Sequence, residues 1–416
     1  MKTQDFFKCF ILGGMIVLIW ANIVGSEGFP NYEAAIRFIG EYPANEDPDW
    51  SDRNQGVTHD CCNWYFTQTY QIWKIPVGVD LMEATDGENG VFFRALALFP
   101  EGTDYPDLLN EGYDHFGDPC YYEHSGKGFL VVPVEDNTGG GPAMCGILAF
   151  FRPEDLSYID HCCINNGGNR APWCAVDLEG QIYSSIDSDV FHINIFHVDW
   201  DLLFEQNVAY VLNNGSPIET FQLKDSAGNP TIISGDYLQG GDFTPSNELL
   251  YLVHGNDSEV HSGNGIHIFE MATGRRVAWS SREGGLFHFL WDPSGIYYDE
   301  PEGMTYWDLD DMLVPGGITG QLHVILNEND PAGNDNVWFK HYTNVIHVDE
   351  SPIIPIPWAL QRGTVYAPYS TVSQAANLAW DGSIIRIVAG NYPEAVTITK
   401  KVRIEPKGGH VIIGEE

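Results

Sequence analysis

Five stretches of similar design follow one another between Gln55 and Thr343, and this repetition constrains the fold more than any other feature. Each copy has a short strand of small residues, a polar turn and further strands with alternating apolar residues. The copies begin at Gln55, His115, Ala171, Gly240 and Glu300. Because units repeated every few tens of residues indicate radial repetition, we predict an all-β protein whose residues 27–345 form a β-propeller of five to seven blades. A large β-sandwich with irregular loops is the alternative.

Two of the first-strand sequences carry a family resemblance. The segments "QGVTHD", from Gln55, and "EPEGMTYWD", from Glu300, resemble inner strands of secreted six-bladed propellers, among them calcium-dependent lactonases and esterase-like phytases. The resemblance implies a central channel that holds calcium and hydrolyses a lactone or an ester. It also implies that Glu302 stands where the lactonases present a glutamate.

The N-terminal segment has the layout of a secretory signal. Lys2 and Lys8 precede an apolar run from Cys9 to Trp20, and small residues follow around Ser26. This order predicts a signal peptide over residues 1–26 and a secreted or otherwise extracytoplasmic protein. An uncleaved membrane anchor is the alternative, and after cleavage we expect no membrane association.

The charge balance is strongly acidic. Fifty-eight acidic residues against twenty basic ones give a formal charge of −38, which repels nucleic acid, so we expect no nucleic-acid partner. Such an excess suits calcium sites or simple solubility.

Seven cysteines follow the signal segment, and all are disulfide candidates: Cys61, Cys62, Cys120, Cys145, Cys162, Cys163 and Cys174. Two vicinal pairs stand in similar contexts, "THDCCNW" and "IDHCCIN". Adjacent Cα atoms lie only ~3.8 Å apart, below the usual disulfide range, so each pair should bond outward or not at all. The odd number predicts an unpaired thiol or an intermolecular disulfide, and secretion favours disulfides over a zinc site with His59 and His161.

The composition changes after Thr343. Three prolines between 352 and 357 predict a stiff linker over residues 346–366, or a strap that closes the propeller. Residues 367–416 begin with a short helix capped by Ser370 or Thr371, and short strand patterns follow. The phrase "GNYPEAVTITKKVRI" resembles the cap and first rungs of the right-handed parallel β-helix of pectate lyases. Because repeat folds need about three units, we expect a truncated β-helix with low order or an exposed strand edge after Gly390.

The candidate site residues come from aligning the copies at the propeller channel. The alignment places Gln55, His115, Asp118, Asp242 and Glu302 at or near one channel entry. Carboxylate and amide oxygens around one axis suit Ca²⁺, with Glu302, Asp242 and Asp118 as metal ligands. His59 or His115 would then accept a proton in a metal-assisted hydrolysis. The alternative is that these residues cap strands and turns.

Two further features admit both a functional and a structural interpretation. The loop "NENDPAGNDN" at 327–336 is either a peripheral calcium site or a solvated turn. The stretches "HVDWDLL" and "WDLDDML" either stack sugars or pack in the core, and blades commonly bury tryptophan.

Three functions therefore remain open. The first is a secreted binding protein whose propeller face recognises a carbohydrate or an extracellular protein. The second is a Ca²⁺-dependent hydrolase at the channel, and the third is a targeting part of a larger polysaccharide-degrading β-helix protein. The sequence has no G-x-S-x-G, phosphate-loop or H-E-x-x-H motif, which leaves the question of catalysis open.

Overall fold

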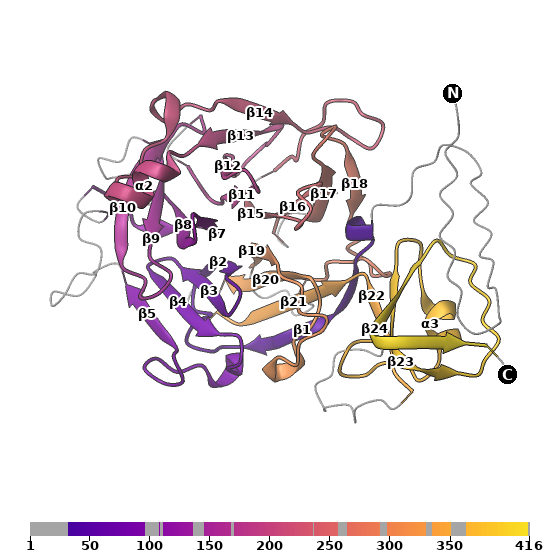
Figure 1. Cartoon of the computed structure of the whole chain (residues 1–416). Helices are drawn as coiled ribbons and strands as arrows, with labels where there is room; N and C mark the ends of the chain where they lie inside the picture. The colour runs from indigo at the N-terminus through magenta and orange to yellow at the C-terminus, as the bar shows by residue number, and fades with distance from the viewer. Residues whose placement is uncertain are drawn as a thin grey trace.

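Five antiparallel sheets stand around a common axis in the computed structural model (Figure 1). The structure describes residues 32–95, 108, 111–135, 145–167, 170–235, 237–256, 264–291, 298–329, 335–350 and 363–414. The predicted propeller is thus confirmed, and its blade number is five.

Each sheet is one blade, and the order of its strands runs from the axis outward. Blade 1 holds β2 (Asn54–His59), β3 (Asn63–Gln68), β4 (Gln71–Pro76) and β5 (Phe92–Ala95). Blade 2 holds β6 (His115–Phe116) and β7 (Cys120–His124), which both pair with β8 (Lys127–Glu135), then β9 (Gly146–Phe151) and β10 (Tyr158–Ile164). Blade 3 holds β11 (Ala175–Val176), β12 (Gln181–Ser184), β13 (His192–His197) and β14 (Glu219–Gln222). Blade 4 holds β15 (Leu238–Phe243), β16 (Leu249–His254), β17 (Gly265–Glu270) and β18 (Arg276–Trp279).

Blade 5 joins the two ends of the propeller. It holds β19 (Tyr298–Tyr306), β20 (Leu322–Asn329) and β21 (Val337–Thr343), and its outermost strand is β1 (Arg37–Glu46) from the start of the described chain. Arg37 lies opposite Thr343 in the antiparallel register. The ring is therefore closed by backbone hydrogen bonds between distant segments.

The five innermost strands form a closed ring around the axis. β2 contacts β7, β7 contacts β11, β11 contacts β15, β15 contacts β19, and β19 contacts β2. These strands come from the first strand of each repeated stretch, as the sequence pattern predicted. Their C-terminal ends share one face of the propeller.

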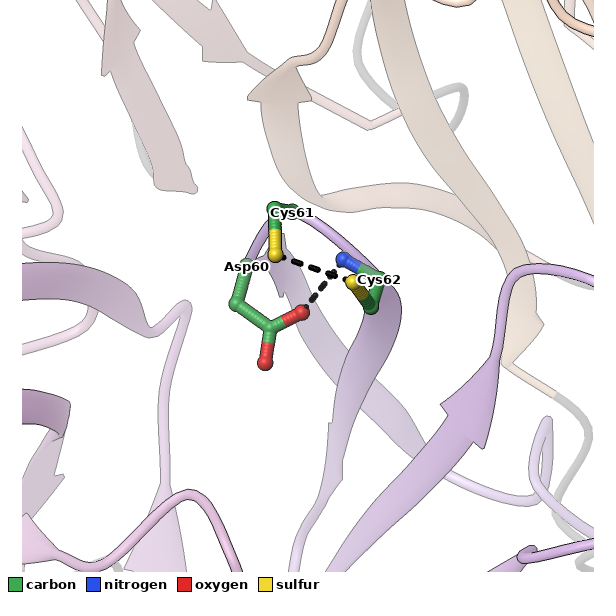
Figure 2. A group of neighbouring side chains, drawn as sticks. All are labelled: Asp60, Cys61 and Cys62. Atoms are coloured by element: carbon green, nitrogen blue, oxygen red, sulfur yellow. Dashed lines mark hydrogen bonds between the residues drawn. The ribbon is translucent and has the colours of Figure 1, made fainter.

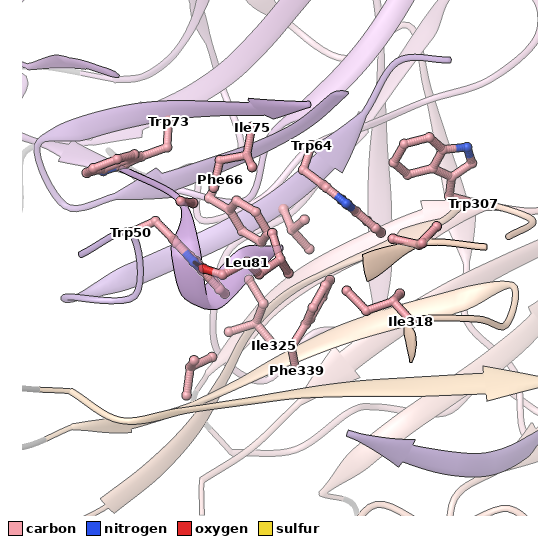
Figure 3. Packing of buried hydrophobic residues seen from close by; sticks show 14 of the residues in the cluster. Trp50, Trp64, Phe66, Trp73, Ile75, Leu81, Trp307, Ile318, Ile325 and Phe339 are labelled. Atoms are coloured by element: carbon pink, nitrogen blue, oxygen red, sulfur yellow. Dashed lines mark hydrogen bonds between the residues drawn. The ribbon is translucent and has the colours of Figure 1, made fainter. Parts of the chain in front are cut away.

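Large aromatic side chains fill the space between neighbouring blades. Figure 3 shows this packing between blades 1 and 5, where Trp64 and Trp307 meet edge to face with ring centroids 4.5 Å apart. Trp50 stacks on Phe66 at 4.1 Å in the same cluster. Trp200 and Trp307 are 6% and 8% exposed, so the tryptophans of the two acidic-aromatic stretches pack in the core and do not offer a free sugar platform.

A second, smaller unit follows the propeller. β22 (Val345–Val348), β23 (Ile384–Tyr392) and β24 (Arg403–Ile413) form a parallel sheet, and α3 (Val372–Leu378) packs on it. Thr371 caps α3 by accepting the Gln374 N–H, which confirms the predicted helix start. The expected β-helix is not confirmed: the described residues show one three-stranded parallel sheet, in which "AVTITK" is not a strand.

The C-terminal unit rests against the propeller. The indole of Trp380 donates to the carbonyl of Ala35, and Arg386 and Lys407 both pair with Asp311 at 3.0 and 2.8 Å. β24 is the outer strand and its side chains are largely exposed, in agreement with the exposed edge expected after Gly390.

Several sequence-based expectations lie outside the described residues. These are the signal peptide over 1–26, most of the 346–366 linker and the centre of the 327–336 loop. Within the part of the chain that is described, no helix is both long enough and apolar enough for a membrane span.

The short helix α2 (Trp200–Gln206) and four 3-10 turns in the described residues connect strands of the propeller or precede β1. They leave the five-bladed frame unchanged.

Candidate functional site

The propeller axis is closed at its centre by Asp118, which lies between β6 and β7 and is fully buried. Its Oδ1 accepts the Val57 N–H of β2 at 2.9 Å. Its Oδ2 accepts the N–H groups of Gly241 in β15, at 3.2 Å, and Met304 in β19, at 3.3 Å. The Asp118 carbonyl accepts the Cys174 N–H, next to β11, at 3.1 Å. One residue of blade 2 is therefore bonded to all four other blades.

Three glycines allow the inner strands to approach this carboxylate. A Cβ added at Gly303 would stand 2.3 Å from Asp118 Oδ1 and 2.6 Å from the Gly56 Cα. At Gly240 it would stand 2.8 Å from the Gly303 Cα. Backbone and carboxylate thus fill the middle of the axis, and the two ends of the axis are separate environments.

The end at the N-termini of the inner strands holds three of the predicted residues in hydrogen-bonded pairs. His115 Nε2 lies 2.7 Å from Gln55 Oε1, and because an amide oxygen only accepts, Nε2 carries the proton in this pair. Glu302 Oε2 accepts from Gln239 Nε2 at 2.8 Å. Of the residues that the sequence placed at one channel entry, Gln55 and His115 contact each other at this end, and Glu302 contacts Gln239.

The pKa values at this end favour neutral groups. Burial lowers the pKa of His115 to about 4, and the nearby Arg170 guanidinium contributes in the same direction. Burial and the neighbouring Glu300 carboxyl raise the pKa of Glu302 well above its usual value, with smaller contributions from Asp335 and Asp118. Burial and the neighbouring carboxyl therefore favour the neutral form of Glu302.

The opposite end, at the C-termini of the inner strands, contains a pocket of about 420 Å³, which we call the axial pocket. All five innermost strands contribute to it: Thr58 and His59 from blade 1, Cys120 to Glu123 from blade 2, Val176 and Asp177 from blade 3, Asp242 and Phe243 from blade 4, and Thr305 and Tyr306 from blade 5. Leu178, Thr244, Pro245 and Asn247 complete its lining.

Aromatic rings form much of the wall of the axial pocket. Tyr121, Tyr122, Phe243 and Tyr306 all line it. His59 stacks on Trp307 with ring centroids 4.4 Å apart and an interplanar angle of 2°. The pocket therefore offers flat apolar surfaces beside polar groups.

Asp242 is a carboxyl residue in the wall of the axial pocket. It accepts the Tyr306 N–H at 2.8 Å, the Phe243 N–H at 2.7 Å and the Thr305 hydroxyl at 3.1 Å. Burial raises its pKa to about 6, although these hydrogen bonds act in the opposite direction. Asp242 therefore changes charge near physiological pH.

His59 lies on the same wall but is held by backbone groups. Its Nδ1 is 2.8 Å from the Asp60 carbonyl and its Nε2 is 3.1 Å from the Tyr306 carbonyl. Burial lowers its pKa. Since both ring nitrogens face acceptors, the observed contacts give His59 no nitrogen directed at a substrate, and its role as a proton acceptor stays a prediction.

The structure does not bring the three proposed metal ligands together. Asp118 is at the centre of the axis, Glu302 is at one end, and Asp242 is in the pocket at the other end. Within the described ranges, the only group of three ligand side chains whose donor atoms lie within 4.8 Å of one another is Asp60, Cys61 and Cys62 (Figure 2). Calcium binding itself stays a prediction.

The cysteines separate into three pairs and one single thiol. Cys145 and Cys163 form a disulfide, so the second vicinal pair does bond outward. Cys120 and Cys174 are buried with their sulfurs 3.4 Å apart, and Cys61 and Cys62 are exposed with sulfurs 2.9 Å apart. Cys162 is the odd cysteine, and it packs against the core of blades 2 and 3.

Sequence reasoning missed the pocket residues of the second and third blades. Tyr121 and Tyr122 lie in β7, Asp177 directly follows β11, and Asp242 is near the C-terminal end of β15 in the fourth copy. Aligning the ends of the first strands, and not only their beginnings, identifies them.

The comparisons with known proteins give a similar architecture. No protein-family model matches the chain, and none of the curated proteins matches it. Among solved structures, a thermostable family-43 glycoside hydrolase aligns with a TM-score of 0.39 and 14% identity, over 70% of this chain and 88% of that one.

Two further solved structures are similar at the same level. The alpha-L-arabinanase of Cellvibrio cellulosa complexed with arabinohexaose gives a TM-score of 0.35 at 13% identity, covering 71% of this chain and 92% of that one. The GH43_1 enzyme of Xanthomonas citri complexed with xylose gives 0.37 at 10% identity, covering 81% and 94%. At these TM-scores the similarity carries no argument about function, and the propeller assignment rests on the strand pairing.

Proposed function

We propose that the protein binds a carbohydrate in the axial pocket. The observation that carries this proposal is the convergence of tyrosine rings and carboxyl groups from four blades, with Thr58 and His59 from blade 1, on one cavity of about 420 Å³. Sugar rings present apolar faces and hydroxyl edges, and aromatic rings beside polar groups match both. Extracytoplasmic location remains part of the proposal, and the Cys145–Cys163 disulfide supports it.

The charge of the pocket narrows the ligand class. Glu123, Asp177 and Asp242 line the pocket, and none of its described lining residues is a lysine or arginine. With a formal charge of −38 on the whole chain, an anionic polysaccharide would be repelled. A neutral oligosaccharide is therefore the proposed ligand, and an extracellular protein is the competing one.

A panel of neutral glycans followed by titration calorimetry tests this proposal. Tyr121→Ala should weaken binding about tenfold, because losing one aromatic contact costs about 1.4 kcal/mol. Tyr210→Ala is the matched control, since Tyr210 is 40% exposed and does not line the pocket. Binding to no neutral glycan, or equal affinity of the Tyr121→Ala and wild-type proteins, contradicts the proposal.

Glycoside hydrolysis is the second candidate, and the pKa of Asp242 favours it. A carboxyl with a pKa of about 6 is protonated in a useful fraction near neutral pH and can protonate a leaving-group oxygen. Asp177 or Glu123 would supply the second carboxylate. Release of the aglycone from aryl glycosides by the wild type, lost in Asp242→Asn with binding retained, separates hydrolysis from binding alone.

The calcium-dependent lactonase or esterase expected from the sequence remains a separate proposal. It places the reaction at the Glu302 end of the axis, where Glu300 and Asp335 also lie nearby. Lactone hydrolysis that EDTA abolishes and calcium restores supports it, and a calcium-independent rate contradicts it. The third expectation, a targeting role within a larger polysaccharide-degrading protein, stays a proposal as well.

A further inference from the structure

The turn between β2 and β3 holds two exposed sulfurs face to face. Cys61 Sγ and Cys62 Sγ lie 2.9 Å apart (Figure 2). They are the two exposed cysteines among those described, since the others are buried, half-buried or already bonded. Reagents in solution therefore reach this pair before any other described thiol.

The backbone of this turn is fixed by a network that does not involve the sulfurs. Asp60 Oδ1 accepts the N–H groups of Cys62 and Asn63 at 2.6 and 2.7 Å, and Asp60 Oδ2 accepts the Tyr65 hydroxyl at 2.7 Å. The Val77 N–H donates to the Cys62 carbonyl at 2.8 Å. The backbone that carries the two thiols is thus held in place, so that rotation of each side chain alone sets the distance between the sulfurs.

The same network argues against a metal centre at this position. Both Asp60 oxygens accept hydrogen bonds from protein groups, so the group offers two sulfurs and no free carboxylate. Structural zinc sites need four ligands, and His59, the nearest imidazole in sequence, faces backbone carbonyls instead. The chemistry left to the pair is that of a dithiol.

We propose that Cys61 and Cys62 form a thiol–disulfide exchange site that reacts with low-molecular-weight disulfides and closes to a vicinal disulfide. One thiolate attacks a sulfur of the small disulfide, forms a mixed disulfide and releases one small thiolate. The second cysteine, as thiolate, attacks the protein sulfur and releases the other small thiolate. The pair loses two electrons and two protons, and the small disulfide is reduced to two thiols.

The geometry favours the second step. The sulfurs must approach from 2.9 Å to about 2.05 Å, a shift of roughly 0.9 Å within one turn. The Cα atoms of adjacent residues lie closer than in ordinary disulfides, and such strained bonds are readily reduced. The site therefore cycles between two states, in contrast to Cys145 and Cys163, which already form a disulfide. The expectation was that each vicinal pair bonds outward or not at all, and closure of Cys61 and Cys62 within the pair would depart from it.

The pair also lies close to the axial pocket. His59, which lines the pocket, is two residues before Cys61. The phenol of Tyr121, in the pocket wall, interacts electrostatically with Cys61. The proposed exchange does not depend on carbohydrate binding, so the two proposals fail or succeed separately.

Peptide mass mapping of the full-length protein after incubation with oxidised glutathione tests the exchange. The wild type should lose about 2 Da in the peptide that contains both cysteines and keep no glutathione there. Cys62→Ser should keep a stable glutathione adduct on Cys61, because the second thiol is missing. Cys162→Ser is the control and should behave as the wild type.

Two outcomes overturn the proposal. One is a wild-type protein that accumulates glutathione on Cys61 or Cys62, or forms a disulfide-linked dimer, without closing the pair. The other is a pair that remains as two free thiols while Cys62→Ser also takes up no glutathione. Tight zinc binding by the reduced pair that prevents closure counts against it in the same way.

Discussion

Removing the Asp118 carboxyl should destabilise the whole propeller. In Asp118→Ala, the N–H groups of Val57, Gly241 and Met304 lose their acceptor in a site that glycine packing closes to water. An unsatisfied buried donor costs about 1–3 kcal/mol, so three cost about 3–9 kcal/mol. Burying the carboxyl is itself unfavourable, as its raised pKa indicates, and this offsets part of the loss. We expect a net loss of about 3–6 kcal/mol.

A graded pair of variants distinguishes this explanation from a general loss of packing. Asp118→Asn keeps the side-chain shape but has one acceptor oxygen, so its NH2 group faces at least one backbone donor, and the expected loss is about 1–3 kcal/mol. Asp225 also accepts backbone N–H groups, from Ala227 and Asn229, but in an exposed turn. Asp225→Ala should leave the free energy of unfolding nearly unchanged, because water replaces the carboxylate.

Guanidinium unfolding followed by tryptophan fluorescence measures these differences. The order of stability should be wild type, Asp225→Ala, Asp118→Asn and then Asp118→Ala. If the alanine variant at 118 does not fold, the asparagine variant still gives a measurable difference. Asp118→Asn and Asp118→Ala both within about 1 kcal/mol of the wild type would refute the central role of this carboxyl.

Three further predictions concern packing, pH and the buried thiols. Gly303→Ala should cost more than about 3 kcal/mol because its Cβ would overlap backbone and carboxylate, whereas Gly78→Ala, with open space around it, should be nearly neutral in the same unfolding assay. Burial raises the pKa of Asp310 to about 8, so its contribution to stability is complete below its unfolded value of about 4 and is lost as pH rises through 8. Histidines with lowered pKa values act only below about 6.5, so between pH 6.5 and 8 the titration of Asp310 should lower wild-type stability by about 1–2 kcal/mol, and Asp310→Asn should make the measured fall smaller by this amount. Cys120 and Cys174, 3.4 Å apart, should be disulfide-linked in protein made under oxidising conditions, and recovery of both as free thiols after non-reducing unfolding contradicts this.

Local sequence patterns determined much of the propeller. Strand length, alternation and turn residues are set by neighbours in the chain, so the five stretches beginning at Gln55, His115, Ala171, Gly240 and Glu300 matched five blades. The helix cap at Thr371 could likewise be predicted from the sequence, because capping involves residues only three positions apart.

Strand pairings between distant segments could not be predicted from the sequence. The strand β1 joins β21 across about 300 residues, and nothing local marks Arg37 as the partner of Thr343. The parallel strands after Val345 looked like β-helix rungs because each strand reads the same whether it belongs to a rung or to a small sheet.

For the candidate site too, the sequence determined some features and the tertiary structure determined the others. The sequence alone determined that polar residues recur at the ends of the first strands, and therefore named Gln55, His115, Asp118, Asp242 and Glu302. Only the tertiary structure decided that Asp118 fills the axis, that Asp242 and Glu302 face opposite ends, and that tyrosines line the pocket. The physical reason is that the level of a side chain along the propeller axis depends on two things. One is its position in its own strand, and the other is how the five inner strands are staggered against one another.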